Sequence, residues 1–268
     1  MTLGSNGSIT PLPEQDHPLL RVTGVSKTFG GIAAVSAVSL EVGAGESVGL
    51  VGPNGAGKTT LFNCICGQLR PDRGSVELSG SELLGTPTYK RARLGIGRTY
   101  QRVEIFPDMT VEEHLLVSLR ASERRTQLWR DLCNMSAPTS AEKKRVDAVL
   151  DLIGIQRQAK TPVSALGLGS CRLVELGRAL VSEPVLLMAD EPSSGLDVRE
   201  THELSQLLRS LQRERGMAML LVEHDLGMVG EVVDRTIVMN LGEIIAEGAF
   251  DDVMADPSVR RAYLGVEA

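Results

Sequence analysis

Long hydrophobic runs are missing from this 268-residue chain. A membrane-spanning helix needs roughly 18–20 apolar residues in succession. The best apolar stretch, residues 184–189, ends at the acidic pair Asp190 and Glu191. The N-terminus also lacks a basic start followed by an apolar block, so we expect no secretory signal. The sequence therefore excludes a membrane channel built from this chain alone.

A surplus of basic residues is missing too, because 28 Lys and Arg stand against 34 Asp and Glu, giving a net charge of −6. This balance argues against non-specific binding to nucleic acid. Cysteine is too sparse for a disulfide framework, and we interpret Cys64, Cys66, Cys133 and Cys171 as reduced cytosolic thiols that fill space. With 42% hydrophobic and 23% charged residues, the composition is that of a globular protein and not of a disordered or fibrous chain.

Strands and helices alternate at both ends of the sequence and leave a helical middle. Residues 1–18 are rich in Gly, Ser, Asn and Pro and are interpreted as a disordered leader. Helical spacing dominates the middle of the chain, at residues 111–120, 141–153 and 171–181. Elsewhere the pattern predicts helices over 61–70 and 198–215, and strands near 20–25, 38–42, 47–51, 75–78, 185–189, 217–222 and 235–239. Strands separated by helices imply a mainly parallel α/β sheet. The predicted core covers 19–92 and 183–268, and a helical insert covers 93–182.

A glycine-rich segment joins the strand at 47–51 to the helix that follows. It fits the phosphate-binding pattern G-x-x-x-x-G-K-[ST] and reads Gly52-Pro53-Asn54-Gly55-Ala56-Gly57-Lys58-Thr59. Glycines let successive backbone N–H groups point at an anion, and the following helix adds the positive partial charge of its N-terminus. Lys58 supplies a point charge for the outer phosphates, and the Thr59 hydroxyl suits Mg²⁺. The segment predicts a nucleotide phosphate site.

Two adjacent acidic residues, Asp190 and Glu191, end the buried strand at 185–189. Asp190 is placed to hold the hydration shell of a metal ion, and Glu191 can accept a proton from the attacking water or orient it. The alternative is a strand that ends in two solvated acids. Beside a phosphate-binding loop, hydrolysis is the stronger interpretation.

With these segments in place, the chain resembles the ATP-binding cassette (ABC) ATPases, the motor subunits of ABC transporters, over about residues 19–265. The resemblance extends to Ser193-Ser194-Gly195-Leu196-Asp197, which matches the aspartate loop that contacts a second cassette. His224 matches the switch histidine at the γ-phosphate, and Gln101 matches the glutamine between the metal site and the helical insert. Phe29 lies where the family stacks an aromatic ring on adenine. Taken singly, such a His, Gln or Phe is more often structural or simply polar.

The resemblance implies a P-loop NTPase (RecA-like) core with a mainly parallel sheet, an antiparallel β subdomain and an inserted helical subdomain, all in one domain over 19–268. It implies that ATP and Mg²⁺ are the cofactors and that Thr60 joins the glycine loop in binding nucleotide. It assigns Mg²⁺ to Thr59, Gln101 and Asp190. The catalytic residues that it implies are Glu191, His224, Lys58 and Gln101.

The family signature, Leu-Ser-Gly-Gly-Gln, is represented here by Leu166-Gly167-Leu168-Gly169-Ser170. Only Leu166 and Gly169 match, and Gly167 has no hydroxyl to donate to the γ-phosphate of a partner cassette. The following helix and the Gly169 N–H are still available to that phosphate. The second cassette is either an identical chain or a related one, and a mixed pair would have one stronger and one weaker site.

Finer details resemble one branch of the family. Leu61-Phe62-Asn63, Phe106-Pro107-Asp108-Met109-Thr110 and Ala262-Tyr263-Leu264-Gly265 are similar to ATPases of branched-chain or hydrophobic amino-acid importers. This implies a permease in the membrane, an extracytoplasmic substrate-binding protein, and a cytoplasmic place on the inner face of the cell membrane. A group of basic residues lies in or beside the insert: Lys90, Arg91, Arg93, Arg98 and Arg102. This group either docks on the permease or on lipid head groups, or it forms a solvated surface.

Three alternatives stay open beside this interpretation. A soluble ABC ATPase that acts on nucleic acid or ribosomes would share the motifs, but the acidic balance and the absence of sustained heptads oppose it. A regulatory protein that binds nucleotide without hydrolysing it is opposed by the complete set of motif residues. A transporter for another substrate is the third, since cargo specificity would belong to the permease and the binding protein.

Overall fold

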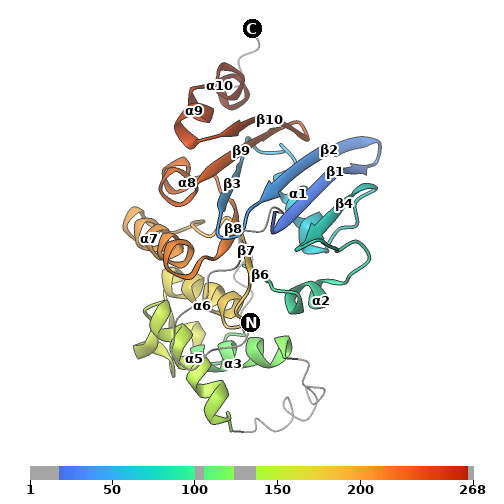
Figure 1. Cartoon of the computed structure of the whole chain (residues 1–268). Helices are drawn as coiled ribbons and strands as arrows, with labels where there is room; N and C mark the ends of the chain where they lie inside the picture. Colours follow the sequence, from blue (N-terminus) through green and yellow to red (C-terminus); the bar gives the residue numbers. More distant parts are fainter. Residues whose placement is uncertain (1–17, 100–105, 124–136, 265–268) are drawn as a thin grey trace.

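The computed structural model of the protein describes residues 18–99, 106–123 and 137–264. The protein contains two β-sheets and a group of helices that lies at the bottom of the view in Figure 1. Residues 1–17 of the expected leader, Gln101, Arg102, Cys133 and Gly265 lie outside the described residues. Within the described residues, every helix is too short or too polar to cross a bilayer.

The larger sheet has six strands in the order β10-β9-β3-β8-β7-β6. Every neighbouring pair is parallel except β10 and β9, which confirms the mainly parallel sheet expected from the sequence. All residues of β3, β7 and β8 are buried, as expected for a sheet covered on both faces. The strands are β3 (Ser47–Val51), β6 (Ile96–Arg98), β7 (Leu186–Asp190), β8 (Ala218–Val222), β9 (Arg235–Asn240) and β10 (Glu243–Gly248). Because neighbouring strands run in the same direction, the carboxyl ends of β3, β7 and β8 meet at one edge.

The smaller sheet is antiparallel, with the order β2-β1-β4-β5, and lies to the right in Figure 1. Its strands are β1 (Leu20–Phe29), β2 (Ile32–Val42), β4 (Arg73–Leu78) and β5 (Ser81–Glu82). Buried Leu20, Val22 and Val25 on β1 share a hydrophobic core with Leu61 and Phe62 of helix α1 (Lys58–Cys66). The core therefore joins the antiparallel sheet to the helix that begins at the glycine loop.

Helix α1 ends earlier than its apolar spacing predicts. The predicted end near Arg70 is wrong, because Gly67 adopts a left-handed conformation with φ of 80° and stops the helix after Cys66. Buried Arg91, from α2 (Thr88–Arg93), then donates hydrogen bonds to the carbonyls of Cys64 at 3.1 Å and Ile65 at 2.6 Å. Arg91 thus provides hydrogen-bond donors for carbonyl groups at the end of α1. Because its side chain is buried there, Arg91 belongs neither to a docking face nor to a solvated surface, and both interpretations of the basic group are wrong for this residue.

The helical insert contains α3 (Val111–Ser122), α5 (Ser140–Leu152) and α6 (Leu168–Leu180), with short 3-10 turns at η1 (Gln156–Gln158) and η2 (Val163–Ala165). The three helices expected from the sequence are present within a few residues. Leu115, Leu150 and Val174 belong to one core with strands β7 and β8. The boundary of the insert at residue 93 stays a prediction, and β6 pairs with β7 in the sheet three residues beyond it.

Four helices from the last third of the chain lie beside the parallel sheet. Helix α7 (Val198–Arg215) lies beside α8 (Leu226–Val232), and α9 (Phe250–Ala255) and α10 (Pro257–Leu264) lie near β9 and β10 (Figure 1). On α7, Leu204, Leu208 and Leu211 are buried and recur at helical spacing. The expected amphipathic helix over 198–215 is confirmed.

A buried ion pair stabilises the helical insert. Arg120 of α3 donates from Nε to Glu142 Oε1 at 2.9 Å and from Nη2 to Oε2 at 3.2 Å. Glu142 also accepts the backbone N–H of Thr139, which closes the capping box at the start of α5. The hydrogen bonds from Arg120 lower the pKa of Glu142 from 4.5 to about 2. Removing one partner of such a pair leaves the other charge buried.

We expect Glu142→Gln to lower the free energy of unfolding by about 3 kcal/mol at pH 7, measured by urea denaturation. The contribution of a carboxylate with a lowered pKa is complete above its unfolded value and is lost as the pH falls. The difference between the parent protein and Glu142→Gln should therefore shrink between pH 4.5 and about 2. A difference that stays constant over this interval would contradict the assignment.

Candidate functional site

The glycine loop lies between β3 and α1 in close contact with two other backbones. A Cβ added to Gly52, where φ is 148°, would lie 2.1 Å from the Met239 carbonyl oxygen, and one on Gly57 would lie 2.2 Å from that of Ala34. Only glycine fits such approaches. Among the described residues no side chain caps the N-terminus of α1, so its first N–H groups point toward the loop without a side-chain partner. The loop is built as an anion cradle.

Lys58 lies across this loop with 5% of its surface exposed. Its Nζ donates to the carbonyl oxygens of Gly52 at 2.7 Å and Pro53 at 3.1 Å. Burial lowers the pKa of the Lys58 ammonium, and the charges of Glu191 and Asp190 oppose that change. The lysine is therefore close to the acidic pair. Of the other predicted members, Ala56 is buried, Thr60 is partly buried, and Asn54, Gly55 and Thr59 are exposed.

Asp190, at the end of β7, is 3% exposed and has a carboxylate oxygen with no hydrogen-bond donor among the described residues, Oδ1. Its Oδ2 lies 3.9 Å from Arg98 Nη2. Burial raises the pKa of Asp190, and Glu191 and Glu223 raise it further, while Arg98 and His224 lower it. A buried oxygen without a partner is costly. A divalent cation or its hydration water would satisfy it, so the donor set fits Mg²⁺.

Glu191 and His224 meet at the same edge of the sheet. His224 Nε2 lies 2.6 Å from Glu191 Oε1. The backbone of Glu191 is in the left-handed region, with φ of 49°, and its N–H donates to the Val222 carbonyl at 2.8 Å. A non-glycine residue holds this conformation only when its surroundings determine it. The structure thus brings together Lys58, Asp190, Glu191 and His224, and their individual roles stay predictions.

The signature segment and the aspartate loop lie side by side. Gly167 is the N-cap of α6, and a Cβ on Gly169 would lie 2.4 Å from Glu200 Oε1 on α7. Asp197 caps α7, because its Oδ1 accepts the Glu200 N–H at 2.8 Å. Leu168 and Val198 are exposed beside these turns. Leu166 and Ser170 are partly buried at the two ends of the segment.

Phe29 ends strand β1 in the antiparallel sheet and exposes 47% of its surface. Lys27 Nζ lies 5.5 Å from the centre of its ring. The exposed ring leaves a face for a planar group, and adenine stacking stays a prediction. Gln101 lies outside the described residues, so its role stays a prediction as well.

The C-terminal helix reaches the glycine loop. Burial raises the pKa of the Tyr263 hydroxyl, and the nearby Gly52 backbone N–H opposes that rise. The end of the chain, which sequence patterning did not resolve into elements, therefore lies near the glycine loop.

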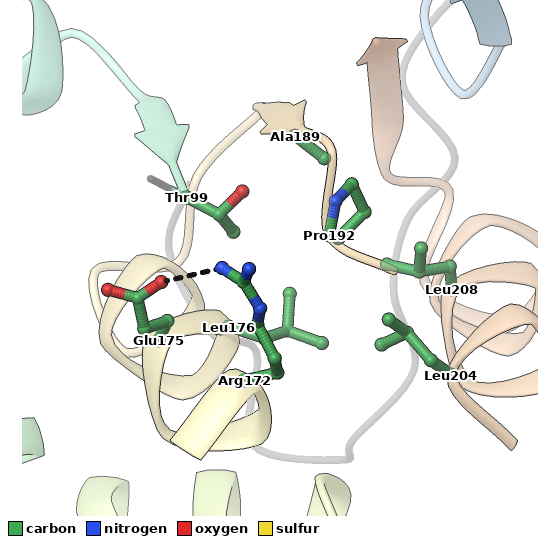
Figure 2. A pocket seen from close by; sticks show the side chains of 8 residues that line it. All are labelled: Thr99, Arg172, Glu175, Leu176, Ala189, Pro192, Leu204 and Leu208. Atoms are coloured by element: carbon green, nitrogen blue, oxygen red, sulfur yellow. Dashed lines mark ion pairs between the residues drawn. The ribbon is translucent and has the colours of Figure 1, made fainter. Parts of the chain in front are cut away.

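A small cavity separates α6 from the turn that follows Glu191 (Figure 2). Arg172 and Glu175 of α6 form an ion pair beside it, with 3.7 Å between Nη1 and Oε2, and Arg172 Nη2 donates to the Ser194 carbonyl at 3.0 Å. The volume of about 10 Å³ is at the lower limit of what can hold one water molecule. The cavity is lined by Thr99, Arg172, Glu175, Leu176, Ala189, Pro192, Leu204 and Leu208. It lies between α6 and α7 and is too small for a nucleotide.

Sequence reasoning missed Arg172 and Glu223 as contributors to this site. Glu223 directly follows the apolar strand β8 and is 2% exposed. A charged residue between a fully buried strand and a candidate catalytic histidine was the available signal. Arg172 carried no such signal, because the carbonyl that it contacts lies 22 residues away in the sequence.

A phosphate cradle after β3 meets carboxylates after β7, which is separated from β3 by β8 in the parallel sheet. Nucleotide hydrolysis needs both parts, and this arrangement places the protein among the P-loop ATPases. The family described as "ABC transporter" matches residues 35–194, and "Branched-chain amino acid ATP-binding cassette transporter" matches residues 243–268. The chain belongs to the ABC transporter family and is an ATP-hydrolysing cassette.

Curated relatives and solved structures agree with this assignment. The chain is 41% identical to the high-affinity branched-chain amino acid transport ATP-binding protein LivG of Salmonella typhimurium, over 93% of this chain and 98% of the relative. It is 36% identical to BraF of Pseudomonas aeruginosa, which carries the same description, with the same coverage. The ADP conformation of an ATP-binding cassette of an ABC transporter superposes with a TM-score of 0.82 at 30% identity, covering 93% of this chain and all of that one. The P-loop core with its parallel sheet is thereby confirmed.

Proposed function

We propose that this chain is the ATPase subunit of an importer for branched-chain or other hydrophobic amino acids. The observation that carries the proposal is the match of residues 243–268 to the branched-chain amino acid cassette family. That segment includes β10, α9 and α10, and its Tyr263 lies near the Gly52 backbone of the glycine loop. The names of the two curated relatives support the same cargo class.

The roles proposed for the site residues rest on the family resemblance and on the positions of the described members. Backbone N–H groups of the non-proline residues among 52–57 and the Lys58 ammonium hold the phosphates of ATP, and Phe29 stacks on the adenine. Thr59, Asp190 and Gln101 would hold Mg²⁺, which would neutralise phosphate charge. Glu191 accepts a proton from the attacking water or orients it, and His224 contacts the γ-phosphate.

The assembly contains a second cassette, identical or related, that faces the signature segment. Leu168 at the start of α6 and Val198 at the start of α7 are exposed, and among the described residues the N-cap of α6, Gly167, makes no side-chain hydrogen bond. A helix N-terminus of this kind attracts a phosphate from the facing site. Loss of the γ-phosphate then changes the contacts at Asp190, His224 and Gln101 and moves the helical insert against a membrane permease on the inner face of the cell membrane.

Reconstitution tests the cargo. The chain would be purified with the permease and substrate-binding protein encoded by its neighbouring genes and placed in proteoliposomes, and uptake of radiolabelled leucine and of lysine would be compared. We expect uptake of leucine that requires ATP on the side of the cassette, with little uptake of lysine. Absence of leucine uptake by a complex that hydrolyses ATP would contradict the cargo assignment, and stimulation of hydrolysis by RNA instead would favour the alternative that acts on nucleic acid.

A further inference from the structure

Glu223 is a buried carboxylate whose two oxygens bind the backbones of two different loops. Oε1 accepts the Ser193 N–H at 2.8 Å, in the turn that follows Glu191. Oε2 accepts the N–H groups of His224 at 2.8 Å and Asp225 at 3.3 Å. A single side chain thus connects the loop after β7 to the loop after β8.

These two loops carry the residues that meet at the reactive edge. Glu191 is in a left-handed conformation, and its turn is closed by the Ser194 N–H, which donates to the Glu191 carbonyl at 3.1 Å. The bond from Ser193 to Glu223 is a side-chain contact that helps to hold the same turn, beside the bond from Arg172 to the Ser194 carbonyl. On the other loop, Glu223 fixes the peptide N–H of His224 itself. Its contacts therefore determine the backbone on both sides of the 2.6 Å contact between His224 and Glu191.

We propose that Glu223 is a positioning residue for ATP hydrolysis, which aligns the backbones of Glu191 and His224 so that these two side chains meet at the γ-phosphate. The inference rests on the proposed roles of Glu191 and His224. It assigns Glu223 no contact with nucleotide, metal or water.

The chemistry of the carboxylate suits this role better than that of a neutral amide. An ionised carboxylate has two oxygens that only accept, which matches three N–H donors arriving from two sides. A glutamine would turn its NH₂ group toward one set of these donors.

The test is Glu223→Gln in the full-length protein, with ATP turnover expressed per bound nucleotide. We expect kcat to fall about tenfold or more, while KM and the Kd for MgATP stay within about twofold, since the glycine loop is untouched. Because Glu223 acts by bringing Glu191 and His224 together, the same substitution in a His224→Ala background, where that contact is absent, should lower kcat by less than about twofold. Wild-type kcat in Glu223→Gln, or an equal fall in both backgrounds, would overturn the inference.

Further variants separate this role from loss of stability and from failure of the proposed function. Glu142→Gln also removes a buried carboxylate that accepts a backbone N–H, but it lies in the helical insert, and it should lower the melting temperature while keeping kcat. If Glu191→Gln and His224→Ala both keep the parent kcat, the assigned site roles are wrong and Glu223 has no pair to position. Should Glu223→Gln not fold, Glu223→Asp provides the same comparison, and an unchanged kcat in that variant overturns the inference.

Discussion

In the Glu191→Gln variant, kcat for ATP should fall about 10²-fold or more while MgATP still binds. The amide has nearly the size of the carboxylate, but it cannot accept a proton from the attacking water, and general-base catalysis contributes about 10²–10⁴-fold. Its oxygen can still face His224, which lies 2.6 Å from Oε1 in the parent protein. Steady-state phosphate release and equilibrium binding of MgATP, measured on the same preparation, check the two halves of this expectation.

A second Glu→Gln substitution, at an exposed site, tests whether the loss of turnover comes from the position of Glu191 and not from the Glu→Gln change itself. Glu203 is an exposed acid on α7 that pairs only with exposed Arg199 among its described contacts, and Glu203→Gln should keep the parent kcat. Turnover by Glu191→Gln at the parent rate would remove Glu191 from the reaction. A parent protein that releases no phosphate even in the assembled transporter would instead favour the regulatory alternative.

The parts of the fold that could be predicted are those whose signal is local. Strands β3 and β7 are short apolar runs that end at a motif, and the strong spacing of Leu204, Leu208 and Leu211 marks α7. Strand β6 was missed, because its three residues are too few to show alternation. The end of α1 was misplaced, because the apolar spacing continues to Leu69 although Gly67 has already stopped the helix.

For the candidate site, too, the parts with a local signal in the sequence could be predicted and the others could not. The glycine loop and the acidic pair were predictable, since their members are neighbours in the sequence and the sheet only has to bring two strand ends together. The contact of Glu223 with Ser193 was not, because the two residues are 30 positions apart. Arg91 was misinterpreted for the same reason, since the carbonyls that it satisfies at the end of α1 lie 26 and 27 residues before it. Long-range backbone contacts of a side chain leave no pattern in composition or spacing.

Lys58→Met should abolish most of the affinity for ATP while leaving the free protein folded. The methionine keeps the length of the buried stem but removes the ammonium, which donates to the Gly52 and Pro53 carbonyls. Without nucleotide, relief from burying a charge offsets the loss of these two hydrogen bonds, so we expect the free energy of unfolding to change by no more than about 1 kcal/mol. The rise in melting temperature that MgATP causes should disappear, because only binding to the folded state produces it.

Calorimetry with a series of nucleotides locates the lost contact. Hydrogen bonds from a charged donor contribute about 1.5–3 kcal/mol each, so two contacts to phosphate oxygens correspond to about 10²-fold or more in Kd. If Lys58 binds the outer phosphates, the loss of affinity must be large for ATP, smaller for ADP and close to zero for AMP. Lys90→Met, at an exposed lysine on α2, should leave all three affinities unchanged. Equal losses for the three nucleotides would mean that Lys58 shapes the loop and does not bind the outer phosphates.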